Sequence, residues 1–159
     1  MSNKAILNKI KFEIKQVDKL LNNYEDLIRK CKEKEPELVE LTALASVLHS
    51  FYNGIENIFS LIAKGVDESK PKGSNWHKEL LIQMTESKDS REAIISEELK
   101  DEIKDYLGFR HFYRHSYSFY LDWNEMKELI LSIFDTWNKI KENLNNFVEN
   151  SFVENSNEK

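Results

Sequence analysis

Apolar residues recur at steps of three and four along most of the chain, which is the spacing of one face of an α-helix. One long stripe covers residues 6–28, and a second covers residues 38–62. Shorter stripes span residues 76–84 and 99–107, and a last long stripe covers residues 126–147. No segment of the sequence alternates convincingly with a period of two. The pattern predicts an all-α protein, an antiparallel bundle of four main helices plus one shorter helix.

Breaks in the pattern mark the expected helix ends. The segment KCKEKEPE interrupts the first two stripes, and its Pro36 can open a new helix in the first turn. The only long loop rich in glycine, proline and serine is KGVDESKPKGSN. Asp122 and Glu125, in DWNE, have the spacing of a capping box at the start of the last helix. We expect a single domain over residues 1–150 and a polar, frayed tail over residues 151–159.

Composition points to an intracellular protein. The chain has 159 residues, which suffices for one core but not for two domains. Its one cysteine excludes an intramolecular disulfide, which is compatible with a reducing compartment. Lysines interrupt the apolar residues of the amino terminus, unlike a signal peptide, and no apolar run approaches the roughly 20 residues that span a bilayer. We therefore expect a soluble, cytoplasmic domain with no membrane association.

The charge distribution is uneven. A formal net charge of −5 argues against a protein that coats nucleic acid in general. Between Tyr106 and Leu121, however, there is no acidic residue, while Arg110 and Arg114 provide two permanent positive charges. The local charge of this segment is therefore compatible with an anion site.

The segment FRHFYRHSYSFYLDW (residues 109–123) has three interpretations. In a structural interpretation its basic residues are solvated or paired with acids, and its aromatic residues belong to the core: Phe109, Phe112, Tyr113, Tyr120 and Trp123. In a metal interpretation His111 and His115 are ligands four residues apart. A zinc site needs a third protein ligand, and two neighbouring guanidinium groups repel a dication. We therefore predict no metal.

In the third interpretation the segment binds an anion. An arginine guanidinium can hold two phosphate oxygens, and a nearby histidine can transfer a proton near neutral pH. Together they form a minimal set for cutting RNA without a metal ion. A single arginine and a single histidine make a sparse site, so we expect two copies to face each other across a symmetry axis.

Arg110, His115 and Tyr117 form the pattern R-x4-H-x-Y, which resembles the signature of HepT-type toxins in the HEPN superfamily. Two further stretches, HSFYNGIENIFSLIAKGVD and NWHKELLIQM, resemble the second helix and the tryptophan–histidine segment of one HepT-like branch. The resemblance covers roughly residues 40 to 135, and the first helix matches only as a generic amphipathic element.

This resemblance implies a homodimeric helical bundle with a composite nuclease cleft. It implies a type VII-like toxin–antitoxin system, in which the toxin cuts RNA without a metal or other cofactor. In the residues that match, Arg110 stabilises the phosphate and His115 is the general acid or base, while Arg114 and His111 bind phosphate or RNA. The implied partner is an MNT-type nucleotidyltransferase antitoxin, which neutralises the toxin by adding AMP to Tyr117.

The spacing of the motif poses a geometric problem. On an ideal helix Arg110 and His115 point about 140° apart, so they cannot hold one phosphate from the same face. Either the helix is irregular here, or the arginine of one subunit works with the histidine of the other. We favour the second explanation.

A polar stripe on the second helix is a further candidate. His49, Asn53 and Glu56 recur at steps of four and three among apolar residues. They form either a solvated face or a shell that orients the motif's arginine or histidine. For His77, a packed or helix-start position is favoured over a catalytic one.

Two other functions remain open from the sequence. The chain could be a catalytically inactive HEPN dimer that binds RNA or nucleotide, or a bundle whose role is to engage the nucleotidyltransferase. If it is a nuclease, its RNA target is undetermined, with transfer RNA among the candidates.

Overall fold

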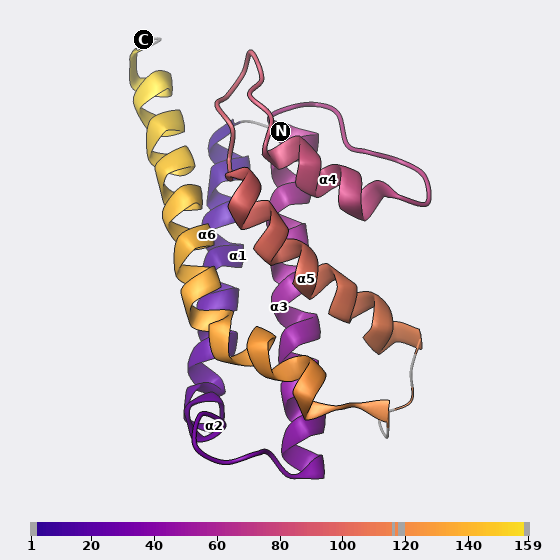
Figure 1. The fold of residues 1–159 in the computed structure, drawn as a ribbon. Coiled ribbons are helices and arrows are strands. Elements are labelled where there is room, and N and C mark those ends of the chain that lie inside the picture. Colours follow the sequence, from indigo (N-terminus) through magenta and orange to yellow (C-terminus); the bar gives the residue numbers. More distant parts are fainter. Residues whose placement is uncertain (1–2, 116, 118–119, 158–159) are drawn as a thin grey trace.

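The computed structural model describes residues 3–115, 117 and 120–157, with side chains up to residue 151. Its helices are α1 (Asn3–Asn23), α2 (Glu25–Lys30), α3 (Leu38–Gly65), α4 (Trp76–Met84), α5 (Glu97–His115) and α6 (Trp123–Asn157) (Figure 1). Within these ranges there is no strand, only an isolated bridge between Lys88 and Arg91. The all-α prediction is confirmed. The homodimer stays a prediction.

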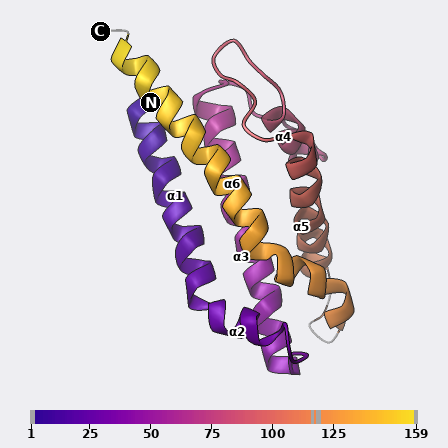
Figure 2. The same ribbon diagram turned by 60° about the vertical axis from the view of Figure 1, so that its left-hand side comes forward.

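Helix α3 is the centre of the bundle. It contacts α1, α4, α5 and α6, and Figure 1 shows α1, α3, α5 and α6 running alternately down and up the molecule. Figure 2 shows α6 crossing diagonally in front of α1 and α3. Aromatic side chains of α3, among them Phe51 and Phe59, are completely buried. The four main helices and the shorter α4 match the predicted bundle.

Three details differ from the predicted boundaries. The first stripe is not one helix, because the backbone of Tyr24 leaves helical geometry (φ −109°, ψ 9°) and α2 begins after it. Pro36 does not lie in the first turn of α3. Glu37 occupies the N-cap, with its backbone N–H donating to Oε1 of Glu40 at 3.0 Å, a bond that proline could not donate. Helix α6 continues to Asn157, through most of the segment predicted as a tail.

The start of α6 follows the expected capping pattern in part. Oδ1 of Asp122 accepts a hydrogen bond from the backbone N–H of Asn124 at 2.9 Å, and the helix begins at Trp123. This hydrogen bond caps the first turn of α6.

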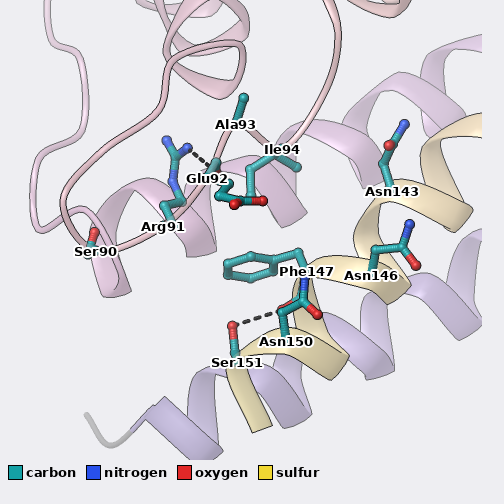
Figure 3. A pocket seen from close by; sticks show the side chains of 10 residues that line it. All are labelled: Ser90, Arg91, Glu92, Ala93, Ile94, Asn143, Asn146, Phe147, Asn150 and Ser151. Atoms are coloured by element: carbon teal, nitrogen blue, oxygen red, sulfur yellow. Dashed lines mark hydrogen bonds between the residues drawn. The ribbon is translucent and has the colours of Figure 1, made fainter. Parts of the chain in front are cut away.

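A buried ion pair anchors the loops at the opposite end of α5. The Arg91 guanidinium donates to both carboxylate oxygens of Asp67 at 2.7 Å, and each side chain is only 2% exposed. The same guanidinium donates to the backbone carbonyls of Glu86, Glu92 and Gln83. Arg91 borders a pocket between this loop and α6 (Figure 3), but its donors are already engaged. It is therefore a structural residue and not an anion receptor.

None of the helices that the structure describes combines the length and the apolar composition needed to cross a lipid bilayer.

Helices α1 and α3 approach each other closely at Gly54. A methyl group added there would lie 2.7 Å from Cγ2 of Val17, while one added at Gly108 on α5 would meet nothing within 4 Å. We expect Gly54→Ala to destabilise the protein by about 1 kcal/mol. The steric overlap with Val17 costs about 1–3 kcal/mol, which outweighs the better helix propensity of alanine. Gly108→Ala is the matched control and should stabilise by up to about 1 kcal/mol. Urea unfolding of both variants checks the prediction, and equal effects would contradict it.

Candidate functional site

Arg110 is held against the central helix. Its Nε donates to Oδ1 of Asn53 on α3 at 3.0 Å, a contact between residues 57 positions apart in the sequence. The two Nη nitrogens have no hydrogen-bond partner among the described residues. The guanidinium is thus fixed at one edge and leaves its two-nitrogen fork available, which is the geometry needed to receive an oxyanion.

Asn53 connects Arg110 to His49. The distance between Nδ2 of Asn53 and Nε2 of His49 is 3.1 Å. The amide nitrogen can only donate, so Nε2 accepts and the imidazole is neutral, with its proton on Nδ1. Burial lowers the pKa of His49, and the positive charges of Arg110 and Arg114 lower it further. Nδ1 of His49 is buried and has no hydrogen-bond partner among the residues that the structure describes, and the ring lies 4.9 Å from that of Tyr113.

Glu56 contacts a different helix. Its carboxylate lies 2.6 Å from Nδ1 of His77 on α4, and Glu56 is only 8% exposed. The ring of Trp76 lies 3.7 Å from that of His77. The polar stripe of α3 is therefore not a solvated face at Glu56, and it splits into two connections. Asn53 contacts Arg110 on α5, whereas Glu56 contacts His77 on α4, and the supporting role of the two residues stays a prediction.

The other residues of the motif lie at the exposed end of α5. His115 is exposed at the last residue of the helix, and its ring is 4.8 Å from that of His111. Arg114 is exposed, and Tyr117 is 72% exposed. Positive charge in the last turn is favourable because it opposes the helix dipole.

Helix α5 is a continuous α-helix through Arg110 and His115. The structure therefore gives no support to an irregular helix as the means of bringing the two side chains together. Arg110 turns toward α3, and no hydrogen bond joins it to His115 in the part of the chain that the structure describes. Both residues lie on the same continuous helix, about 140° apart around its axis at roughly 100° per residue, which disfavours their meeting on one face.

The aromatic residues of the segment do not all belong to the core. Phe109 and Trp123 are buried, and Phe112 and Tyr113 pack partly against the core. Tyr120, which the structural interpretation placed in the core, is 60% exposed. It lies outside α5 and α6, in a turn where its N–H donates to the carbonyl of Tyr117 at 3.0 Å, so helical spacing does not determine its direction. Its ring is 6.4 Å from that of Tyr117.

No third metal ligand accompanies His111 and His115 in the part of the chain that the structure describes. Among the described residues there is no group of three or more histidine, cysteine, aspartate or glutamate side chains placed to hold a metal ion.

Two contacts of the site involve residues outside the R-x4-H-x-Y motif. Asn53 contacts Arg110, and His77 contacts Glu56. The sequence signal for them is the step of three and four on α3 together with the tryptophan–histidine segment, but their partners are set by how α4 and α5 pack on α3.

The fold is an all-α bundle in which Arg110 of α5 is held by the central helix α3. The same α5 ends at the exposed His115, and the exposed Tyr117 follows two residues later in the sequence. A model of the HepT-like protein family matches residues 43–151, from the first turns of α3 into the last part of α6. The chain belongs to the HepT-like protein family. This membership confirms the resemblance and implies a HEPN toxin of a toxin–antitoxin system, whose general partner is an MNT antitoxin. No curated protein and no solved structure matched the chain.

Proposed function

We propose that this protein is an endoribonuclease toxin of a type VII-like system, which cleaves RNA, with transfer RNA among its candidate targets, without a metal ion. The observation that carries the proposal is the Arg110–Asn53 contact, which holds the guanidinium while leaving its fork free. The absence of acidic residues between Tyr106 and Leu121 in the sequence, and the exposed His115, support the same function.

In this proposal the site is composite. Arg110 of one subunit binds the phosphate of the scissile linkage, and His115 of the other subunit transfers the proton. The ribose 2′-hydroxyl loses its proton and attacks phosphorus, the bond from phosphorus to the 5′-oxygen breaks, and the leaving oxygen takes up a proton. The products are a cyclic phosphate and a 5′-hydroxyl. Arg114 and His111, on the same helix end, add positive or hydrogen-bonding contacts to the RNA backbone.

Asn53 positions the catalytic arginine. We expect Asn53→Ala to lower the rate of RNA cleavage by about tenfold to a hundredfold, because a displaced guanidinium loses alignment with the phosphate. The exposed Asn138→Ala on α6 is the control and should keep full activity. Initial rates on one RNA substrate, with circular dichroism to establish folding, check the prediction. A fully active Asn53→Ala enzyme would remove Asn53 from the site.

Control of the toxin in this proposal is AMPylation of Tyr117. The exposed phenol is accessible to a nucleotidyltransferase, and an attached phosphodiester would neutralise nearby Arg114 and block the substrate.

We expect coexpression with an MNT-type antitoxin to increase the intact mass of the toxin by one or more adenylyl groups. Tyr117→Phe should abolish the increase, and Tyr120→Phe, which removes a neighbouring exposed phenol, should leave it unchanged. An unmodified wild-type toxin in the presence of active antitoxin would favour control by complex formation alone.

The second candidate function is an inactive dimer that binds RNA or nucleotide. The free fork of Arg110 suits binding as well as catalysis. RNA binding without turnover by the wild-type protein would favour this function.

A further inference from the structure

We propose that a groove between α1, α3 and α4 binds the single-stranded RNA that flanks the cleaved linkage. This inference rests on the proposed ribonuclease function and specifies how the substrate is held. The groove encloses about 510 Å³, and its basic and aromatic lining consists of Lys9, Phe12, Lys64, Lys70 and Trp76.

The charges of the groove suit a phosphate backbone. Lys9 comes from α1, Lys64 from the last turn of α3 and Lys70 from the loop before α4. None of the three forms an ion pair with another described residue. The groove also contains Glu13 and Glu56, but Glu56 is already bound to His77. In a chain with a net charge of −5, a groove lined by three lysines and two carboxylates has a local excess of positive charge, which favours a polyanion.

Aromatic side chains border the same groove. Phe12 is 59% exposed on α1, so its ring is in contact with solvent instead of the core. The Lys70 ammonium lies 4.3 Å from the centre of the Trp76 ring, which holds this lysine over the groove. Proteins that bind single strands combine a basic groove with aromatic rings on which bases stack. The open Phe12 ring supplies such a surface, and Asn57 and Ser60 supply polar groups for base edges.

The groove continues the surface that holds Arg110. Asn53, Asn57, Ser60 and Lys64 recur at steps of four and three on α3, so they lie along one face of the helix. From Asn53 to Lys64 this face spans about 16 Å, at a rise of 1.5 Å per residue. Figure 1 shows α4 and α5 both lying against α3, the helix that provides this face. A strand whose scissile phosphate lies on Arg110 can thus extend along α3 into the groove.

The direct test is RNA binding in a chain that cannot cleave. In a His115→Ala background, the affinity for a labelled single-stranded oligonucleotide of about ten nucleotides is measured by fluorescence anisotropy at several salt concentrations. The groove variant replaces Lys9, Lys64 and Lys70 with glutamine. The control variant replaces Lys19, Lys32 and Lys34, which are exposed near the other end of α1 and change the net charge equally.

We expect the groove variant to bind at least about tenfold more weakly, and the slope of log K against log salt to fall by about 2, at roughly 0.7 per lost contact. The control variant should keep the wild-type slope. Phe12→Ala should weaken binding by roughly tenfold without changing the slope, because it removes stacking and no charge. Equal losses in the groove and control variants, or no loss in the groove variant, would overturn the proposal. A changed oligomeric state of the groove variant would also overturn it, by making the groove a contact between protein chains.

The groove and the nuclease function can fail separately. With His115 intact, the groove variant should show a raised KM for the long oligonucleotide and an unchanged rate on a dinucleotide, which is too short to reach Lys64. If the wild-type protein cleaves no RNA, the ribonuclease function fails, while the binding measurement still decides whether the groove holds RNA. If His115→Ala abolishes cleavage but the groove variant behaves as wild type, the function stands and the groove assignment is wrong.

Discussion

His115→Ala is expected to lower the rate of RNA cleavage by about two to four orders of magnitude, which is the usual contribution of a positioned acid or base. His115 is exposed at the end of α5, so the substitution removes no core packing and the protein should unfold at the wild-type temperature. Cleavage by the wild type should be unaffected by EDTA. Initial rates on labelled RNA with and without EDTA measure both effects. Equal activity of the two proteins would remove the catalytic role of His115, and loss of activity in EDTA would remove the metal-independent mechanism.

Mixing two inactive variants tests whether the site is composite. In a mixed dimer of Arg110→Ala and His115→Ala chains, one site carries both substitutions, and the other carries an intact arginine and an intact histidine. If subunits exchange freely from equal amounts, half of the dimers are mixed and each has one working site. The expected activity is about a quarter of wild type. If each site took both residues from one chain, every site in the mixture would lack one of them and activity would stay absent.

The second large effect concerns stability. Arg91→Ala is expected to destabilise the protein by about 3–5 kcal/mol, because it leaves the carboxylate of Asp67 buried without its counter-charge. It also removes donors from the backbone carbonyls of Glu86, Glu92 and Gln83. In a chain of this size the midpoint of thermal unfolding should fall by roughly 10 °C.

Lys139→Ala is the matched control for this experiment. Lys139 pairs with Glu102 at 3.2 Å, but both side chains are substantially exposed, so its loss should change the free energy of unfolding by less than about 1 kcal/mol. Urea denaturation followed by circular dichroism measures both variants. Similar small effects would mean that water replaces the guanidinium beside Asp67, and that the loops around Arg91 are less tightly packed than the structure indicates.

The helices were predictable because their apolar periodicity is a local property of the sequence. The stripes on α3 and α6 correspond to helices whose apolar faces are buried. The break at Tyr24 was not predictable, since the apolar spacing continues through it and only the backbone angles change. The exposure of Tyr120 was not predictable either. The structural interpretation placed it in the core from helical spacing, but it lies in a turn, where that spacing does not apply.

The site was predictable as a motif and not as a set of contacts. Arg110, His115 and Tyr117 were singled out because their pattern resembles a family signature, and their roles stay predictions. The contact between Arg110 and Asn53 depends on how α5 crosses α3, and the contact between Glu56 and His77 depends on how α4 does. Side-chain periodicity gives the face of each helix but not its crossing angle or offset, so a polar stripe could not be assigned to one partner helix or the other.

The uninterrupted α5 has a consequence for how a cell could tolerate this protein. Under the composite-site proposal, a newly made chain carries Arg110 and His115 on one uninterrupted helix, about 140° apart around its axis, so a single chain has no complete site and does not cut RNA. Damage would begin only after two copies meet, and at low abundance it would rise with roughly the square of the amount synthesised. Leaky transcription would then be far safer than full expression, even before any antitoxin acts.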